Sequence, residues 1–196
     1  MGVPAGIRAS AGVTSARAPG CHSCPVPLEL RPLTSDDEDH ARAAHAELAA
    51  EGFEFLPFFG ADAEAWDDYL ARIARLSRGE GLPPGIVPWT DLYGIVDGVV
   101  VARVSVRHRL TEALERFGGH VGYAVRPAYR RCGYGTELLR AGLAVARDLG
   151  IDPALVTCDD DNAGSIAVIE RCGGVVADVV ELEDGKLRRR YWLPTR

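Results

Sequence analysis

Lysine, methionine and long hydrophobic runs are scarce or missing in this 196-residue sequence. Lys186 is the only lysine among 22 basic residues, so arginine at any one position carries little information. No apolar run approaches the roughly 18 residues that a membrane-spanning helix needs, and the N-terminus lacks a signal-peptide core. Gly6 stands where a myristoylation site needs Ser or Thr. We therefore predict no membrane partner.

Cysteine is also sparse, with five residues in an odd and scattered set, namely Cys21, Cys24, Cys132, Cys158 and Cys172. Such a set does not predict a disulfide framework, and it favours a reducing compartment. We therefore expect a cytoplasmic protein. Cys21 and Cys24 around His22 have the spacing of half a metal site, but no second pair follows at a matching spacing. We expect no metal.

The charge is acidic and unevenly distributed. The net charge of −6 does not predict a nucleic-acid partner. Residues 1–27 hold two arginines and no acidic residue, and they consist mostly of Gly, Ala, Ser and Pro. A segment with so little large apolar content cannot bury a core, so we predict a disordered leader over 1–27 and a single domain over 28–196. That domain carries 20 basic and 28 acidic residues, a net charge of −8.

The body alternates short apolar runs with amphipathic ones. The first half predicts a strand over 28–33, helices over 36–50 and 63–76, and a hairpin over 92–96 and 99–106. The second half predicts a short helix near 110–117, strands over 121–125 and 154–158, helices over 138–149 and 162–172, and a hairpin over 175–180 and 187–193. The helix over 138–149 has two apolar stripes, one ending at Leu149, and is expected to lie broadly buried on a sheet.

Two features inside these elements bear on function. In the strand over 99–106 one face holds Val100, Ala102, Val104 and Val106. Arg103, Ser105 and the following Arg107 point the other way. Four phenylalanines fall in a loop punctuated by Gly and Pro, namely Phe53, Phe55, Phe58 and Phe59. Such an aromatic cluster either packs into the core or lines a substrate pocket.

The segment between the strand over 121–125 and the following helix predicts an anion site. Arg130, Arg131, Gly133 and Gly135 lie at this junction. The N-terminus of a helix presents unpaired N–H groups and a positive dipole end, and glycine allows a phosphate to approach the backbone. A dinucleotide fingerprint fits poorly because Leu138 fills the third glycine position, and no Gly-Lys-Ser/Thr follows for a P-loop. The remaining alternative is an ordinary strand–turn–helix corner with solvated arginines.

The spacing Arg130-x-x-Gly133-x-Gly135 resembles the acyl-CoA loop of the GNAT superfamily of N-acetyltransferases. The order of predicted elements over 28–196 is also similar to the order in that family. The resemblance implies an α/β (α+β) fold. It has a mixed, mostly antiparallel central sheet of about 6–7 strands, helices on both faces, and splayed fourth and fifth strands. The thioester of acetyl-CoA then lies in the V-shaped gap between these two strands.

The resemblance also implies a set of cofactor-binding residues for acetyl-CoA as co-substrate. Val125 would offer backbone groups to the pantetheine arm. The pyrophosphate would be held by the loop residues Arg130, Arg131, Gly133, Tyr134, Gly135 and Thr136. Asn162 matches an asparagine that contacts the cofactor arm, and capping the following helix is its other, compatible role.

The residues that move protons are less clear. Many family members use a tyrosine seven residues after this asparagine to protonate the departing CoA thiolate, and here that position is Ile169. Either another residue serves, or the thiolate leaves unassisted, which the acidity of thiols allows. Tyr123 is interpreted either as a core residue or as one that reaches the thioester cleft.

The catalytic base is predicted to be His120, whose imidazole has a suitable pKa, with Asp159, Glu112 and His108 as weaker candidates. The alternative for His120 is a residue that bonds backbone at the start of its strand. The resulting function is acetyl transfer to the amine of a small cationic metabolite, which the acidic body would attract. The alternatives are a non-catalytic acyl-CoA-binding regulatory module and a protein N-acetyltransferase. A homodimer is kept as an alternative to the monomer.

Overall fold

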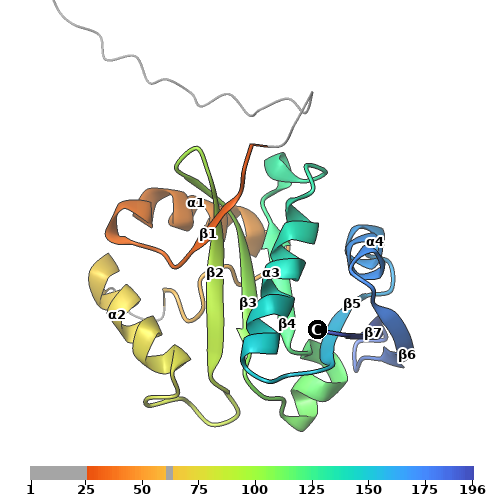
Figure 1. Cartoon of the computed structure of the whole chain (residues 1–196). Helices are drawn as coiled ribbons and strands as arrows, with labels where there is room; N and C mark the ends of the chain where they lie inside the picture. The colour runs from red at the N-terminus through yellow and green to blue at the C-terminus, as the bar shows by residue number, and fades with distance from the viewer. Residues whose placement is uncertain (1–25, 61–63) are drawn as a thin grey trace, which may run out of the picture.

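A computed structural model describes residues 26–60 and 64–196. In this part of the chain seven strands form one sheet in the order β1-β2-β3-β4-β5-β7-β6 (Figure 1). The strands are β1 (Glu29–Arg31), β2 (Trp89–Val96), β3 (Val99–Arg107), β4 (Val121–Val125), β5 (Ala154–Asp159), β6 (Val175–Glu181) and β7 (Leu187–Leu193). The β4–β5 pair is parallel and the other neighbouring pairs are antiparallel. The predicted mixed, mostly antiparallel sheet is confirmed.

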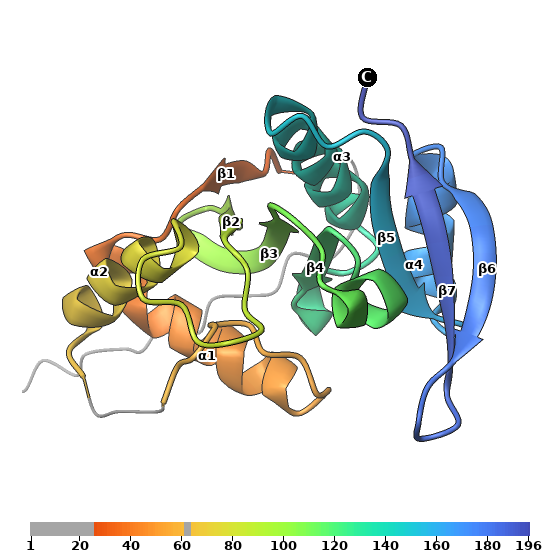
Figure 2. The same cartoon turned by 90° about the horizontal axis from the view of Figure 1, so that it is seen from below.

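Helices cover both faces of this sheet, as the fold class required (Figure 2). On one face lie α1 (Glu38–Ala49) and α2 (Trp66–Ser77), and on the other lies α3 (Tyr134–Asp148), beside α4 (Ala163–Arg171). Short turns of helix precede α1, β4 and α3, namely η1 (Ser35–Asp37), η2 (Leu114–Gly118) and η3 (Pro127–Tyr129). None of the helices in the described segments is long and apolar enough to cross a membrane.

Several predicted boundaries differ from the structure. The strand over 28–33 is reduced to the three residues of β1, and the helix near 110–117 is a single π-helical turn with no buried residue. The helix predicted from 138 begins at Tyr134, because Gly133 takes a left-handed conformation with φ 89° and starts the first turn there. Leu149 follows the last residue of α3 and is 42% exposed, so it is not part of the buried stripe.

The predicted leader lies outside the described residues except at its last two positions. One of these, Val26, packs against the core, and its carbonyl oxygen accepts a hydrogen bond of 3.1 Å from the Tyr134 hydroxyl. The start of the predicted second helix at Ala63 also lies outside the described residues. The division at residue 27 therefore stays a prediction.

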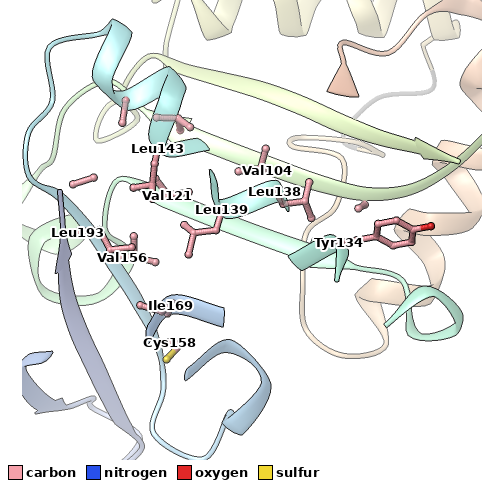
Figure 3. Packing of buried hydrophobic residues seen from close by; sticks show 14 of the residues in the cluster. Val104, Val121, Tyr134, Leu138, Leu139, Leu143, Val156, Cys158, Ile169 and Leu193 are labelled. Carbon is pink, nitrogen blue, oxygen red and sulfur yellow. The ribbon is translucent and has the colours of Figure 1, made fainter. Parts of the chain in front are cut away.

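The main core lies between the sheet and α3 (Figure 3). Leu138 and Leu139 are fully buried there. Gly142 lets the helix approach the strands closely, since a Cβ atom at this position would lie 2.8 Å from a methyl group of Val121 and 2.9 Å from one of Val104. This close packing holds β4 rigidly against α3, which positions the loop between them.

A second core covers the opposite face and divides the phenylalanine cluster. Phe55 is fully buried, with its ring centroid 5.6 Å from that of Tyr93 in an edge-on contact, and Phe59 packs against the aromatic rings of α2. Phe53 and Phe58 instead line the two cavities described below. Each of the two predicted roles therefore applies to some members of the cluster.

Candidate active site

The site is built around β4, which separates from β5 after a single paired position, Val121 opposite Val156. On its other side β4 pairs with β3. The N–H of Arg107 donates to the carbonyl oxygen of His120 at 2.8 Å, and the N–H of Arg126 donates to the carbonyl oxygen of Val101 at 2.9 Å. In an antiparallel pair the bonded residues alternate, so Tyr123 and Val125 turn their backbone groups away from β3. Those groups face the gap between the splayed strands.

A cavity of about 870 Å³ opens at this gap. It collects residues from the end of α1, from β4, from the loop into α3, from the end of β5 and from α4. Every residue predicted to bind the cofactor lines it, namely Val125, Arg130, Arg131, Gly133, Tyr134, Gly135, Thr136 and Asn162. The chain therefore brings these positions together around one space.

The loop into α3 forms a cradle of backbone N–H groups. Arg131 and Gly133 both have positive φ, 66° and 89°. Within the described chain, the N–H groups of Arg131, Gly133, Tyr134 and Gly135 donate to no protein acceptor. The N–H of Thr136 is used by the Gly133 carbonyl at 2.9 Å, so Thr136 adds no backbone donor. Free N–H groups at the positive end of a 15-residue helix favour an anion.

The arginines around this cradle have different roles. Arg130 donates through Nε to the Val125 carbonyl at 3.0 Å and forms an ion pair with Glu51, so it braces the loop against α1. Arg131 and Arg171 line the cavity, and neither has a carboxylate within 4 Å in the described part of the chain. These two side chains are the cations that an incoming pyrophosphate would meet.

Asn162 has the capping role that was expected. Its Oδ1 accepts a hydrogen bond of 2.9 Å from the N–H of Ser165 at the start of α4. Capping uses the oxygen of the amide, and the side chain still lines the large cavity. Both roles suggested by the sequence are therefore compatible with its position.

The candidate bases are not assembled at one place. Asp159 lines the large cavity, where it is paired with Arg188 at 2.5 Å. Glu112 is exposed and lines neither described cavity. His108 contacts the Thr90 hydroxyl at 2.9 Å through Nε2, away from both cavities.

His120 is held by the backbone at the start of β4. Its side chain is buried, and its Nδ1 accepts a hydrogen bond of 3.0 Å from the N–H of Leu155. Burial, and then the nearby Arg107 charge, lower the pKa of His120. A neutral imidazole that accepts through Nδ1 carries its proton on Nε2, so its lone pair is already engaged. This geometry favours the alternative of a residue that bonds backbone over a base.

Tyr123 is a polar group of the large cavity that the predicted site omitted. Its hydroxyl is buried and finds no hydrogen-bond partner of ordinary geometry in the described chain. Burial raises the pKa of Tyr123 to about 12, and the neighbouring Ser165 acts in the opposite direction. Ile169, at the family's tyrosine position, is fully buried in the core. The family's tyrosine position therefore supplies no phenol to this cavity, whereas Tyr123 does.

A second cavity of about 240 Å³ lies on the α1 and α2 face of the sheet. Its polar lining comes from Glu54, Arg103, Ser105 and Arg107, with Phe58 and Trp89 among its apolar residues. Arg103 pairs across the strands with Ala124, which lines the large cavity, so the two cavities lie on neighbouring strands. The sequence showed the alternation of polar residues in β3, but it did not indicate a pocket.

No group of three or more His, Cys, Asp or Glu residues that could hold a metal ion occurs within 26–60 and 64–196. Cys158 is buried, and burial raises its pKa to about 11. A thiol with a raised pKa is a poor nucleophile, so Cys158 behaves as a small apolar residue of the core.

Comparison with known proteins identifies the class to which this fold and site belong. A family model described as an acetyltransferase (GNAT) domain matches residues 27–175. The match covers more than half of the chain, and the chain therefore belongs to the GNAT acetyltransferase family. It is an acyl-CoA-dependent N-acetyltransferase, as the resemblance of the loop predicted. A search of curated proteins found no match.

Solved structures share the fold at low sequence identity. The putative acetyltransferase yncA from Salmonella typhimurium, solved with its cofactor acetyl-CoA, is 20% identical with a TM-score of 0.56, over 86% of this chain and 94% of that one. The GNAT domain of S. lividans PAT is 20% identical with a TM-score of 0.55, over 85% and 90%. The ribosomal-protein-S18-alanine N-acetyltransferase from Escherichia coli is 17% identical with a TM-score of 0.51, over 86% and 94%.

Proposed function

We propose that the protein transfers the acetyl group of acetyl-CoA to the primary amine of a small metabolite within a ternary complex. The observation that carries this proposal is the pair of cavities on β3 and β4. The larger one has an anion cradle at one end and open strand groups along its side, and the smaller one has charged side chains and aromatic walls. One space suits a long anionic co-substrate, and the other suits a compact polar acceptor.

Acetyl-CoA fits the residues of the larger cavity. Its pyrophosphate would bind the free N–H groups of Arg131, Gly133, Tyr134 and Gly135, with the side chains of Arg131 and Arg171 supplying positive charge. Its amide-bearing arm would pair with the backbone groups of Tyr123 and Val125 that face away from β3. Asn162 would reach the same arm through the amide nitrogen that its capping role leaves available.

The reaction is a direct attack of a neutral amine on the thioester carbonyl. A C–N bond forms, the C–S bond breaks, the amine loses a proton and the sulfur leaves as a thiolate that can take one up. The outward-facing N–H of Tyr123 is placed to stabilise the developing negative charge on the carbonyl oxygen. The phenol of the same residue is the proton donor that we assign to the departing thiolate.

The amine proton needs an acceptor on the side of the smaller cavity. His120 remains the base that the sequence predicts, but its Nδ1 is engaged by Leu155. Glu54 is the carboxylate that lines the smaller cavity, and it lies beside Phe53, which lines the larger one. We assign the acceptor role to Glu54, acting directly or through one water molecule.

Measurement of free thiol release tests the function. Acetyl-CoA is offered with a panel of primary amines that includes amino acids, amino sugars, polyamines and an N-terminal peptide, and products are identified by mass. We expect thiol release that depends on a small amine and a product heavier by one acetyl group. CoA binding without thiol release would instead indicate the regulatory module, and turnover of the peptide alone would indicate a protein N-acetyltransferase. The homodimer stays a prediction.

A further inference from the structure

The two arginines of the smaller cavity differ in how their charge is balanced. Arg103 is buried and every one of its nitrogens has a partner. It forms an ion pair with Asp91 at 2.9 Å, and its Nη1 donates to the carbonyl oxygens of Glu54 and Phe55 at 2.9 and 3.0 Å. Asp91 in turn accepts from the Trp89 indole N–H at 2.6 Å. Arg103 is thus a structural cation that shapes the wall of the cavity.

Arg107 is a cation without a counter-ion. Its Nη1 donates to the carbonyl oxygens of Gly118 and Gly119 at 3.3 and 3.1 Å. Its Nε and Nη2 bond to nothing in the described chain, and no carboxylate there lies within 4 Å. Burial, and then the charge of Arg103, lower the pKa of Arg107. Removing such a charge from water is costly unless an anion balances it, so the cavity wall is prepared for an anionic ligand.

The groups around Arg107 define the size and character of that ligand. Ser105 precedes it by two residues on the same face of β3, lines the same cavity and has an uncommitted hydroxyl group in the described chain. Phe58 and Trp89 form an apolar wall, with ring centroids 6.2 Å apart. A guanidinium that offers two free nitrogens beside a hydroxyl group matches a carboxylate. The aromatic wall suits a modest apolar side chain.

The anion site lies next to the point where the strands separate. Ser105 pairs with Gly122, and a Cβ atom on Gly122 would lie 3.8 Å from Nη1 of Arg107. The next residue is Tyr123, whose backbone faces the gap between β4 and β5. A carboxylate on Arg107 would therefore place an amine on the adjacent carbon near that gap.

We propose that the acceptor is an α-amino acid, or a close analogue whose amine lies one carbon from its carboxylate. Nε and Nη2 of Arg107 and the hydroxyl group of Ser105 hold the carboxylate. The amine points to the β4–β5 gap, and the side chain rests against Phe58 and Trp89. This inference rests on the proposed function and selects one class of acceptor within it. It disfavours polyamines, because their second cation would meet Arg107.

Matched acceptors test the carboxylate. For each L-amino acid that is acetylated, kcat/KM is compared with that of its amide and of the amine that lacks the carboxylate. We expect both analogues to lose about 10²-fold or more, because they leave Arg107 unpaired. Arg107→Gln should raise KM for the amino acid about tenfold or more, and it should bring the ratio of kcat/KM between the amino acid and its amide close to one. The KM for acetyl-CoA should not change.

Three further variants keep the test decisive. Arg109→Gln is the matched control, since Arg109 is exposed and lines neither cavity, and it should behave as the wild type. If Arg107→Gln does not fold, Arg107→Lys and Ser105→Ala should still lower the preference for the amino acid. Turnover of amines irrespective of a carboxylate, unchanged in these variants, would overturn the carboxylate site and leave the acetyltransferase standing. Absence of thiol release with every amine would count against the function itself.

Discussion

Gly135 is the residue at which the anion cradle enters α3, and its lack of a side chain is the feature to test. A Cβ atom there would lie 3.4 Å from a methyl group of Val168, an ordinary contact, so a small side chain fits without moving the backbone. The position also lies in the first turn of α3, where an acidic residue is favourable for the helix. A substitution at Gly135 therefore probes ligand binding rather than folding.

Gly135→Asp is expected to weaken CoA binding by about tenfold or more, because a carboxylate would face the pyrophosphate. Gly135→Ala is the control and should bind CoA within a few-fold of the wild type. Calorimetric titration measures both, and thermal melting should show that both variants fold. Unchanged affinity in the aspartate variant would mean that the pyrophosphate does not bind at this loop.

His120 shows how one contact separates a structural role from a catalytic one. The Leu155 N–H that binds Nδ1 is otherwise unpartnered, so an acceptor at residue 120 is needed for stability. Asparagine can supply that acceptor but cannot act as a base near neutral pH. We expect His120→Asn to keep turnover within a few-fold, and His120→Ala to lose about 1–3 kcal/mol of stability. A loss of about 10²-fold in turnover with His120→Asn, at unchanged stability, would identify His120 as the base.

The same residue predicts a dependence of stability on pH. The folded pKa of His120 lies below the ordinary value of 6.5, so the unfolded chain binds the proton first as the pH falls. Protonation of His120 therefore lowers the free energy of unfolding below about pH 6.5, and it leaves that free energy unchanged at higher pH. Wild-type protein should lose more stability than His120→Asn when denaturant melts at pH 7.5 and pH 5.5 are compared. Parallel losses would show that His120 is not the responsible group.

At the scale of elements, the contact between α3 and the sheet positions both the cradle and β4. Gly142 makes this contact possible, since a side chain there would meet Val121 and Val104 at less than 3 Å. Asn162 has a comparable local role for α4, because its side chain bonds the first turn. The two helices thus hold the cradle and the cofactor arm from one face of the sheet.

Gly142→Ala is expected to destabilise the protein by about 1–3 kcal/mol, because the methyl group forces α3 away from the strands. This result would oppose the ordinary preference of helices for alanine over glycine, which is about 1 kcal/mol. Gly164→Ala in α4 is the control, since its Cβ atom would have a contact no closer than 3.5 Å and the variant should not lose stability. Denaturant unfolding gives both values. Equal stabilities in the two variants would show that α3 packs less closely than described.

At the scale of the molecule, the anion cradle and the smaller cavity lie on different faces of the sheet. The α3 and α4 face carries the anion cradle, and the α1 and α2 face carries the smaller cavity with Arg107. Arg103 of β3 lines the smaller cavity and pairs with Ala124 of β4, which lines the larger one, and β4 splays from β5 after Val121. The acceptor and the acetyl donor can therefore approach each other from opposite faces.

The composition of the N-terminal segment supports a prediction at this scale. Deletion of residues 2–25 should leave the melting temperature within about a degree and the CoA affinity unchanged, because the segment has few large apolar side chains to bury. The deletion stops before Val26, whose carbonyl oxygen accepts from Tyr134. Deletion of 2–27 should lower the melting temperature through loss of that contact. A large loss of stability in the shorter deletion would show that the segment docks on the domain.

The features that the sequence by itself determined are those set within a few residues of chain. Asp97 and Gly98 both have positive φ in the β2–β3 turn, as their residue types predicted. The Asn162 cap likewise depends on Ser165, three positions away. Hydrophobic alternation was sufficient for the order of elements, and that order, together with the resemblance of the Arg130–Gly135 loop to the GNAT family, indicated the fold class. The boundaries of the predicted elements differed from the structure at the last turn of α3 and at the ends of β1, because these ends depend on packing against other segments.

Contacts between distant segments decided which of these residues can do chemistry. His120 is engaged by Leu155, 35 positions away, and Arg103 is neutralised by Asp91 and by carbonyl groups 48 and 49 positions away. Arg107, four residues from Arg103 on the same strand face, has no such partner in the described chain. The sequence presents the two arginines as equivalent. Only the tertiary structure separates them, because the cost of a buried charge depends on what the folded chain places beside it.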